Sequence, residues 1–278
     1  MSKLRAVIAK ILLLLLVFLV LCLADASLRP SLHGDVKVTP VDSKHNRDTL
    51  VVHLPGLVAD GEWSVRNMTD TWLRYGDVWL VDPTGSRFEH DVLTQKIALL
   101  LEADEHGRII FVGSSLGAFN ALDILKELSP EKVARTVFGF VAVCAPSGGV
   151  SDIKQPLKAT SGVASVFRFG PVTNATWGKL FTRAITGEQP RSFAMTYYID
   201  QVNYVRSRPA PDLELLAKIN FVYLQAANDE VVEPSAANAW TTDDNKIIRV
   251  KAKHVSYDVD TEEWNKAFDK ALGLMTAM

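Results

Sequence analysis

The chain has 278 residues, of which 48% are hydrophobic and 22% are charged, and its formal net charge is −2. This length and composition predict a globular protein with one core that carries an insertion. Because the net charge is close to zero, there is no electrostatic basis for binding nucleic acid, and no nucleic-acid partner is expected.

Residues 1–26 form an amino-terminal leader. Three basic residues, Lys3, Arg5 and Lys10, flank the start of an unbroken apolar run over residues 11–23, and residues 24–26 read A-D-A. This order is typical of a secretory signal peptide. Residues 7–24 could instead serve as an uncleaved membrane anchor, with Lys10 reaching the membrane surface. Both alternatives predict an extracytoplasmic protein, either secreted or anchored to the membrane by the apolar segment.

The next elements are strands. Residues 27–48 are expected to form a stalk with one early strand near residues 36–38. Residues 50–54 read L-V-V-H-L, an apolar strand that ends in a Pro-Gly turn.

Residues 113–117 read G-S-S-L-G and match the pattern G-x-S-x-G. A β-branched and aromatic run at residues 108–112 precedes them, and apolar residues at helical spacing follow them, over residues 118–128. Strand, tight glycine turn and helix predict a nucleophile elbow that exposes the hydroxyl of Ser115. Ser114 is expected to pack or to line a polar surface. A dinucleotide-binding turn would need a second glycine at position 115, and an ordinary glycine-rich turn is the other alternative.

A nucleophilic serine needs a base and an acid that orients the base. His254 is the one histidine after Ser115, and it follows a short strand at residues 247–250. Asp229 follows a strand at residues 221–226, where functional groups gather in open α/β sheets. Glu230 and Glu233 compete for this role, but the D-x-V-V-x-P turn favours Asp229 because it can direct a short carboxylate inward.

The oxyanion hole needs two backbone N–H groups. Leu116 follows the nucleophile and is expected to supply one of them. Leu57, after the strand at residues 50–54, is expected to supply the other, with Gly56 as the alternative donor. His53 precedes Ser115 and is expected to make a hydrogen bond that holds this loop.

Cys144 is the one cysteine beyond the leader, so no disulfide is expected, and it is interpreted as a small buried apolar residue. No cysteine or histidine cluster has the spacing of metal ligands, and no cofactor or metal is expected. Residues 147–218 are too long for a simple connection and are rich in aromatic residues. These aromatic residues either line an acyl site or form a small core of the insertion: Phe167, Phe169, Trp177, Phe181, Phe193, Tyr197, Tyr198 and Tyr204.

Together, the H-L-P-G loop at residues 53–56, the V-W-L-V-D-P-T-G segment at residues 78–85, the elbow at Ser115, Asp229 and His254 resemble the α/β-hydrolase fold superfamily, in its serine esterase and lipase-like form. The resemblance implies a strand at residues 78–81 and a D-P-T-G loop at residues 82–85, ahead of the elbow. The resemblance covers residues 49–275 and identifies no subfamily. It implies a mostly parallel sheet, with reduced amino-terminal strands, in a core of residues 49–146 and 219–278. It also implies a helical cap at residues 147–218. The usual His-Gly pair is missing from the oxyanion loop, which puts the identity of the donors in doubt.

The predicted function is that of a serine hydrolase that cleaves a carboxylic ester through an acyl-enzyme, with a Ser115, His254 and Asp229 triad. The substrate would be a small-molecule or lipid ester. Two alternatives stay open: an amidase or peptidase with the same triad, and a binding protein that uses the same fold without catalysis.

Overall fold

The computed structural model describes residues 7–17, 19–20, 33–44, 46–57, 68, 70–85, 87–149, 151–154 and 195–276. Residues 7–17 and 19–20 are helical, and their side chains are exposed. Across the described part of the chain, no helix is long and apolar enough to cross a membrane. The A-D-A site of the leader lies outside the described residues, so cleavage and anchoring both stay predictions.

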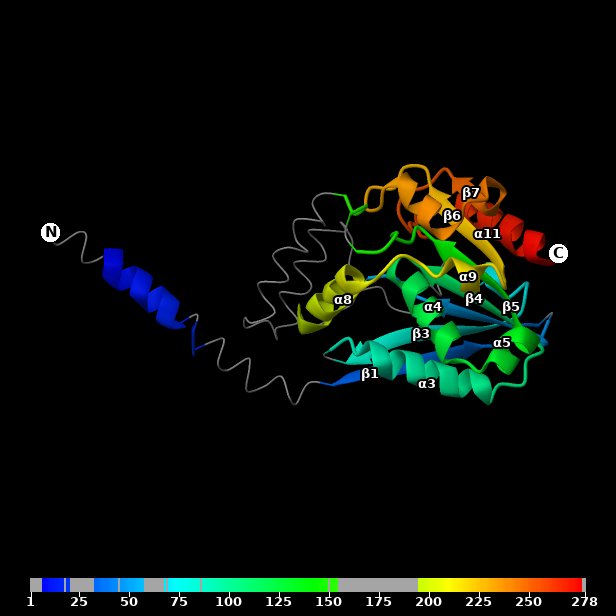
Figure 1. Cartoon of the computed structure of the whole chain (residues 1–278), viewed down its shortest axis with the longest axis horizontal. Coiled ribbons are helices and arrows are strands. Elements are labelled where there is room, and N and C mark those ends of the chain that lie inside the picture. Colours follow the sequence, from blue (N-terminus) through cyan, green and yellow to red (C-terminus); the bar gives the residue numbers. More distant parts are fainter. Residues whose placement is uncertain are drawn as a thin grey trace.

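Seven strands form one sheet in the order β1-β3-β2-β4-β5-β6-β7 (Figure 1). Their bounds are β1 Gly34–Val41, β2 Thr49–Leu54, β3 Asp77–Gly85, β4 Arg108–Ser114, β5 Val137–Val143, β6 Asn220–Ala226 and β7 Ile247–Val250. β1 pairs antiparallel with β3, and all other neighbours in the sheet are parallel. The predicted mostly parallel sheet is confirmed. β1 is the one early strand among the described residues, which agrees with the expected reduction of the amino-terminal strands.

One local prediction is wrong. Residues 82–85 were expected to form a loop, but they continue β3. The reason is the pairing with β1, in which Gly34 lies opposite Gly85 and Val36 lies opposite Pro83. β2 stops pairing with β3 at Leu80, so the last residues of β3 extend beyond it on the β1 side alone.

Alternating residues of the strands bury their side chains in two separate clusters, one on each face of the sheet. In β4, Ile109 and Phe111 belong to one cluster, and Ile110 and Val112 belong to the other. The helices divide in the same way. α3 (His90–Glu102), α4 (Leu116–Glu127) and α8 (Met195–Ser207) cover the first face, and α11 (Thr261–Thr276) covers the second. Shorter helices complete the fold: α5 (Pro130–Thr136), α9 (Leu213–Leu216), α10 (Ala237–Trp240) and the 3₁₀ turns η2 (Pro234–Ala236) and η3 (Asp244–Lys246).

α11 shows why these residues form a covering helix. Trp264, Phe268 and Leu272 recur every four residues, so they lie on one side of the helix and are fully buried against the sheet. Burying each such side chain contributes about 1.5–3 kcal/mol of hydrophobic free energy. α11 packs on this face of β6 and β7, the two strands that precede Asp229 and His254.

Helix α8 lies within the expected cap region but packs on the main core. Tyr197 and Tyr198 are buried in the same cluster as the sheet, and the Tyr197 hydroxyl donates to the Pro83 carbonyl at 3.0 Å. Arg87 pairs with Asp200 of α8 at 3.1 Å. The five predicted cap aromatic residues between positions 167 and 193 lie outside the described residues.

Candidate active site

Ser115 sits in the turn between β4 and α4 with φ 52° and ψ −117°. A positive φ is rare for a residue with a side chain and costs about 1–3 kcal/mol, so the surrounding structure must enforce it. The Ser115 N–H donates to the Val143 carbonyl of β5 at 2.7 Å, which fixes the turn against the neighbouring strand. Ser115 is partly exposed, whereas its neighbours Ser114 and Leu116 are buried. The turn therefore exposes the Ser115 side chain to solvent, although the residues on both sides of it are buried.

The glycines on both sides of Ser115 are required by close backbone contacts. A Cβ on Gly113 would lie 2.5 Å from the Ala118 Cα, and a Cβ on Gly117 would lie 2.1 Å from the Leu54 carbonyl oxygen. Both distances are far below van der Waals contact, so only glycine lets α4 approach β4 and β2 this closely.

We expect Gly117→Ala to destabilise the protein by roughly 1–3 kcal/mol or more, because the added methyl group overlaps the backbone of residue 54. The matched control is Gly273→Ala in α11, where an added Cβ would have no heavy atom within 4 Å. That control should be neutral, or stabilising by up to about 1 kcal/mol, because alanine favours helix. Urea unfolding of both variants gives the comparison. Equal stability of the two would show that the elbow is not packed as described.

Asp229 and His254 form a pair at the carboxyl ends of β6 and β7. His254 Nδ1 lies 3.0 Å from both carboxylate oxygens of Asp229. The Asp229 side chain is fully buried, and that of His254 is 13% exposed. The N–H groups of Val231 and Val232 donate to Asp229 Oδ1 at 2.9 and 2.8 Å, which is the inward-turned geometry that the D-x-V-V-x-P pattern suggested.

The environment keeps Asp229 ionised. Burial raises its pKa, but the charge and the hydrogen bond of His254, together with the two backbone N–H groups, outweigh burial and hold the pKa below its ordinary value. An ionised carboxylate at Nδ1 leaves His254 Nε2 as the nitrogen that can accept a proton, which is what a general base needs.

The two competing carboxylates make other contacts. Glu230 Oε2 accepts from the His254 backbone N–H at 3.2 Å, and Glu233 lies 3.7 Å from Lys154 Nζ. Of the three acidic residues in the turn, Asp229 is therefore the one that meets the imidazole ring. Within the described residues, no hydrogen bond joins the Ser115 hydroxyl to His254. Such bonds are often long in unliganded sites and tighten when substrate binds.

The expected oxyanion donors lie beside the elbow. Leu116 is the first residue of α4, where backbone N–H groups have no acceptor within the helix. A Cβ built on Gly56 would come within 3.2 Å of the Ser115 Cβ, so the loop that carries Gly56 and Leu57 passes directly along the elbow. The position of this loop suits a second donor, while the choice between Leu57 and Gly56 stays a prediction.

Cys144 lies in this site, although its sequence context indicated only a small buried apolar residue. Cys144 directly follows β5, has φ 48° and is fully buried. Its sulfur and the facing side-chain atoms of Asp229 and His254 all lie within 4.8 Å of one another. Cys144 directly follows β5, which lies between the strand that precedes Ser115 and the strand that precedes Asp229. This position at the carboxyl edge of the sheet is the signal from which its place in the site could have been predicted.

Cys144, Asp229 and His254 are the residues of the described chain that could hold a metal ion. Burial and the nearby Asp229 carboxylate raise the pKa of the Cys144 thiol well above its usual value, whereas a metal ligand must be a thiolate. His254 Nδ1 is also already engaged by Asp229. The chemistry of this donor set fits an acid–base pair with a neutral thiol better than a metal centre.

His53 makes a hydrogen bond, as expected, and its partner is Ser114 of the elbow. Its Nε2 lies 3.2 Å from the Ser114 hydroxyl, and its ring stacks on Trp72 at 4.6 Å between centroids. Complete burial lowers the pKa of His53 to about 3, so the ring is neutral near pH 7. The hydroxyl of Ser114 lies 2.7 Å from that of Tyr257, a residue that the sequence analysis did not single out.

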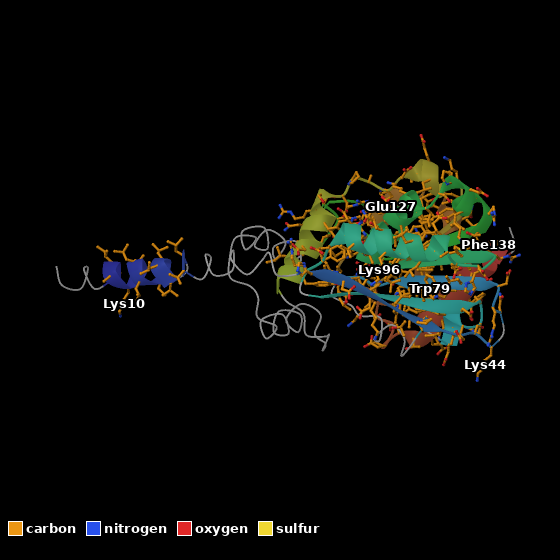
Figure 2. The ribbon with its side chains drawn as sticks, turned by 90° about the horizontal axis from the view of Figure 1, so that it is seen from below. Lys10, Lys44, Trp79, Lys96, Glu127 and Phe138 are labelled. Carbon is orange, nitrogen blue, oxygen red and sulfur yellow. The ribbon has the colours of Figure 1, made fainter. Side chains whose placement is uncertain are left out.

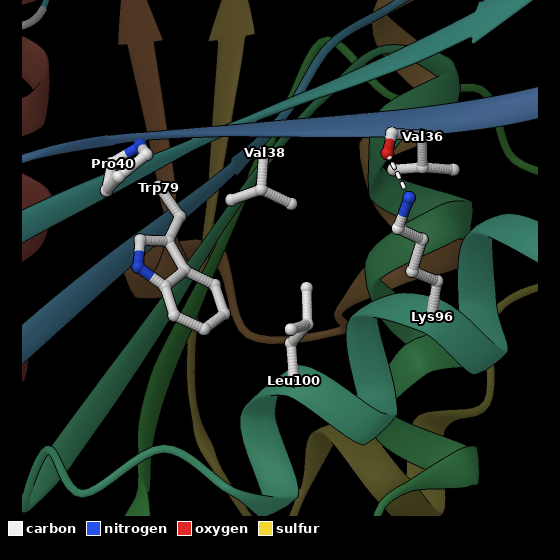
Figure 3. A pocket seen from close by; sticks show the side chains of 6 residues that line it. All are labelled: Val36, Val38, Pro40, Trp79, Lys96 and Leu100. Carbon is white, nitrogen blue, oxygen red and sulfur yellow. Dashed lines mark hydrogen bonds between the residues drawn. The ribbon is translucent and has the colours of Figure 1, made fainter.

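A cavity of about 490 Å³ lies away from these residues, between the outer strands β1 and β3 and helix α3. Figure 2 shows the molecule from the α3 side, with Trp79 and Lys96 labelled. In the close view of Figure 3, Lys96 Nζ donates to the Val36 carbonyl at 2.6 Å and closes one end. β2 separates these strands from β4, so the cavity is distinct from the elbow.

No protein-family model matches the sequence, and no curated protein does. Solved structures with a similar fold include a hydrolase from Pseudomonas aeruginosa, at 14% identity and a TM-score of 0.61, over 86% of this chain and 95% of that one. An enol-lactonase from Burkholderia xenovorans has 11% identity and a TM-score of 0.62, with 86% and 97% covered. The N-acyl homoserine lactonase AidH has 13% identity and a TM-score of 0.61, with 88% and 95% covered. At these identities the similarity establishes the fold alone, and the fold is that of the α/β hydrolases, as the sequence predicted.

Proposed function

We propose that the protein is a serine hydrolase that cleaves a carboxylic ester through an acyl-enzyme. The observation that carries the proposal is the placement of a strained, partly exposed Ser115 and a buried Asp229–His254 pair at the same edge of the sheet. The hydrolase and the two lactonases among the similar structures support a hydrolytic reaction.

In the proposed reaction, His254 Nε2 takes the proton of the Ser115 hydroxyl while the oxygen attacks the ester carbonyl. The carbonyl oxygen becomes an oxyanion, which the N–H groups of Leu116 and Leu57 stabilise. The protonated His254 then gives its proton to the leaving alcohol as the C–O bond breaks, and the acyl group stays on Ser115. Water, deprotonated by His254, repeats the attack and releases the carboxylic acid. Throughout the reaction, His254 Nδ1 keeps its proton and donates it in a hydrogen bond to the Asp229 carboxylate.

Amide or peptide cleavage is the second candidate, because the same groups serve both reactions. The absence of a Ser115–His254 hydrogen bond among the described residues is the observation that favours a third candidate, a binding protein on a hydrolase fold. Labelling by a fluorophosphonate separates the enzyme candidates from the binding protein. Matched p-nitrophenyl esters and p-nitroanilides separate ester from amide cleavage.

We expect kcat/KM to rise from acetyl to octanoyl esters, because the aromatic residues of the 147–218 region suit an apolar acyl group. Each methylene that is buried contributes about 0.8 kcal/mol, or roughly fourfold in kcat/KM. The measurement is a p-nitrophenyl ester series of increasing chain length on the full chain. Values that stay flat or fall along the series would contradict an apolar acyl site.

A further inference from the structure

A buried polar cluster lies directly beneath the elbow, on the α11 side of the sheet. Side chains alternate along a strand, so Ser114 shares a face with Ile110 and Val112 of β4, both members of the cluster that α11 covers. On the same face, β2 places His53 with Val51. Ser114 is 1% exposed and His53 is fully buried. The fold therefore brings two polar side chains into an apolar layer, where unpaired polar groups are costly.

Tyr257 brings the third group from the loop that carries His254. Its hydroxyl lies 2.7 Å from that of Ser114, although the two residues are 143 positions apart. The Tyr257 ring is fully buried, with its centroid 5.3 Å from that of Trp264 and 6.5 Å from that of Trp72. The ring contacts and the hydroxyl contact together fix the Tyr257 side chain, and they thereby restrain the Tyr257 backbone.

The backbone between His254 and Tyr257 is short and strained. Val255 has φ 48°, an unfavourable conformation for a β-branched residue, and the Tyr257 N–H donates to the Val255 carbonyl at 2.9 Å. A turn this tight transmits the position of Tyr257 to His254. Strain of this kind persists only where the surrounding structure enforces it, and the buried Tyr257 provides that restraint.

The Ser114 hydroxyl thus links three parts of the proposed machinery through two contacts. Ser114 directly precedes the nucleophile, His53 precedes the loop of Leu57 by four positions, and Tyr257 follows the base by three positions. A serine hydroxyl has one donor and two acceptor positions, so Ser114 can bond to His53 and Tyr257 at the same time. Alanine at position 114 would break both contacts.

We infer that Ser114, His53 and Tyr257 are positioning residues. The Ser114 hydroxyl fixes the positions of the His254 loop and of β2, which leads to the loop of Gly56 and Leu57, relative to the Ser115 elbow. The inference rests on the proposed function. The geometry makes such a device useful, because Ser115 and His254 lie on separate loops without a direct bond among the described residues. An error of about 1 Å in such a pair can cost on the order of 100-fold in rate.

The test uses Tyr257→Phe, Ser114→Ala and the double variant in the full chain. Tyr257→Phe keeps the packed ring and removes only the hydroxyl. Each single change should lower kcat by roughly tenfold with a smaller effect on KM, because it affects alignment rather than binding. The double variant should be little slower than the slower single variant, because both changes break the same contact.

The matched control is Tyr75→Phe, which removes a tyrosine hydroxyl that bonds to Asp269 at 3.0 Å. Tyr75 lies just before β3, so it is at the amino end of the strands, whereas the Ser115 elbow lies at their carboxyl end. It should lower the thermal midpoint without changing kcat. The inference is overturned if Tyr257→Phe and Ser114→Ala behave like this control, or if their effects on kcat multiply in the double variant.

A readout independent of turnover is the NMR signal of the His254 Nδ1 proton, which lies in the hydrogen bond to Asp229. In Tyr257→Phe and Ser114→Ala this downfield signal should broaden through faster exchange with water, and in Tyr75→Phe it should stay sharp. If the wild-type protein neither hydrolyses esters nor reacts with a fluorophosphonate, the proposed function fails. The NMR comparison still decides the positioning role, and unchanged signals in all variants would overturn it.

Discussion

Ser115→Ala should abolish fluorophosphonate labelling and lower ester turnover by about 10⁴-fold or more, because the change removes the attacking oxygen and no other group can replace it. Ser115 is the partly exposed residue of the elbow, and alanine fits the same turn without new contacts. The measurement is labelling followed on a gel, together with kcat on a p-nitrophenyl ester. Circular dichroism and the thermal midpoint should show an unchanged fold.

Ser114→Ala is the matched control for this result. It removes a hydroxyl one residue away, and the variant should still label to completion, although more slowly if Ser114 positions the machinery. Full activity in Ser115→Ala would refute the assignment of the nucleophile. Complete labelling of Ser115→Ala together with none of Ser114→Ala would move the nucleophile to the neighbouring serine, which its burial argues against.

His254→Ala should lower kcat by on the order of 10³-fold or more, since the base is lost from both halves of the reaction. Asp229→Asn should cost the same or less. Asparagine can still accept the N–H groups of Val231 and Val232 through its carbonyl oxygen, but it lacks the charge that stabilises a protonated His254. Steady-state kinetics on one ester, with the thermal midpoint measured beside it, distinguishes lost chemistry from lost folding.

Glu230→Gln and Glu233→Gln are the controls for the acid. Glu230 contacts only the backbone N–H of His254 among the hydrogen bonds of the described residues, and Glu233 lies near Lys154, so each should change kcat by a small factor. A loss in either variant as large as that of Asp229→Asn would mean that the acid has been assigned to the wrong residue.

The local parts of the site could be predicted from the sequence because each has its own pattern. The glycines around Ser115 report a close backbone approach, and the D-x-V-V-x-P turn reports an inward carboxylate. Apolar runs predicted the strands at residues 108–112, 221–226 and 247–250 close to their observed bounds, Arg108–Ser114, Asn220–Ala226 and Ile247–Val250.

The remaining features depend on contacts between distant segments, which no local pattern encodes. Tyr257 looks like an ordinary loop residue until the sheet brings it to Ser114. Cys144 looks like a small apolar residue until β5 and β6 pair and set it against Asp229. Residues 82–85 have the composition of a turn, but their pairing with β1 makes them strand.

The order of the elements along the chain has a consequence for how the protein is made. During synthesis the elbow of Ser115 emerges with β4 and α4, whereas Asp229 and His254 come from β6 and β7, more than 100 positions later in the chain. β6 and β7 are buried under α11, which is synthesised after both of them. A partly synthesised chain therefore carries the elbow without the Asp229–His254 pair, and the candidate site is complete only after the last strands have folded under α11.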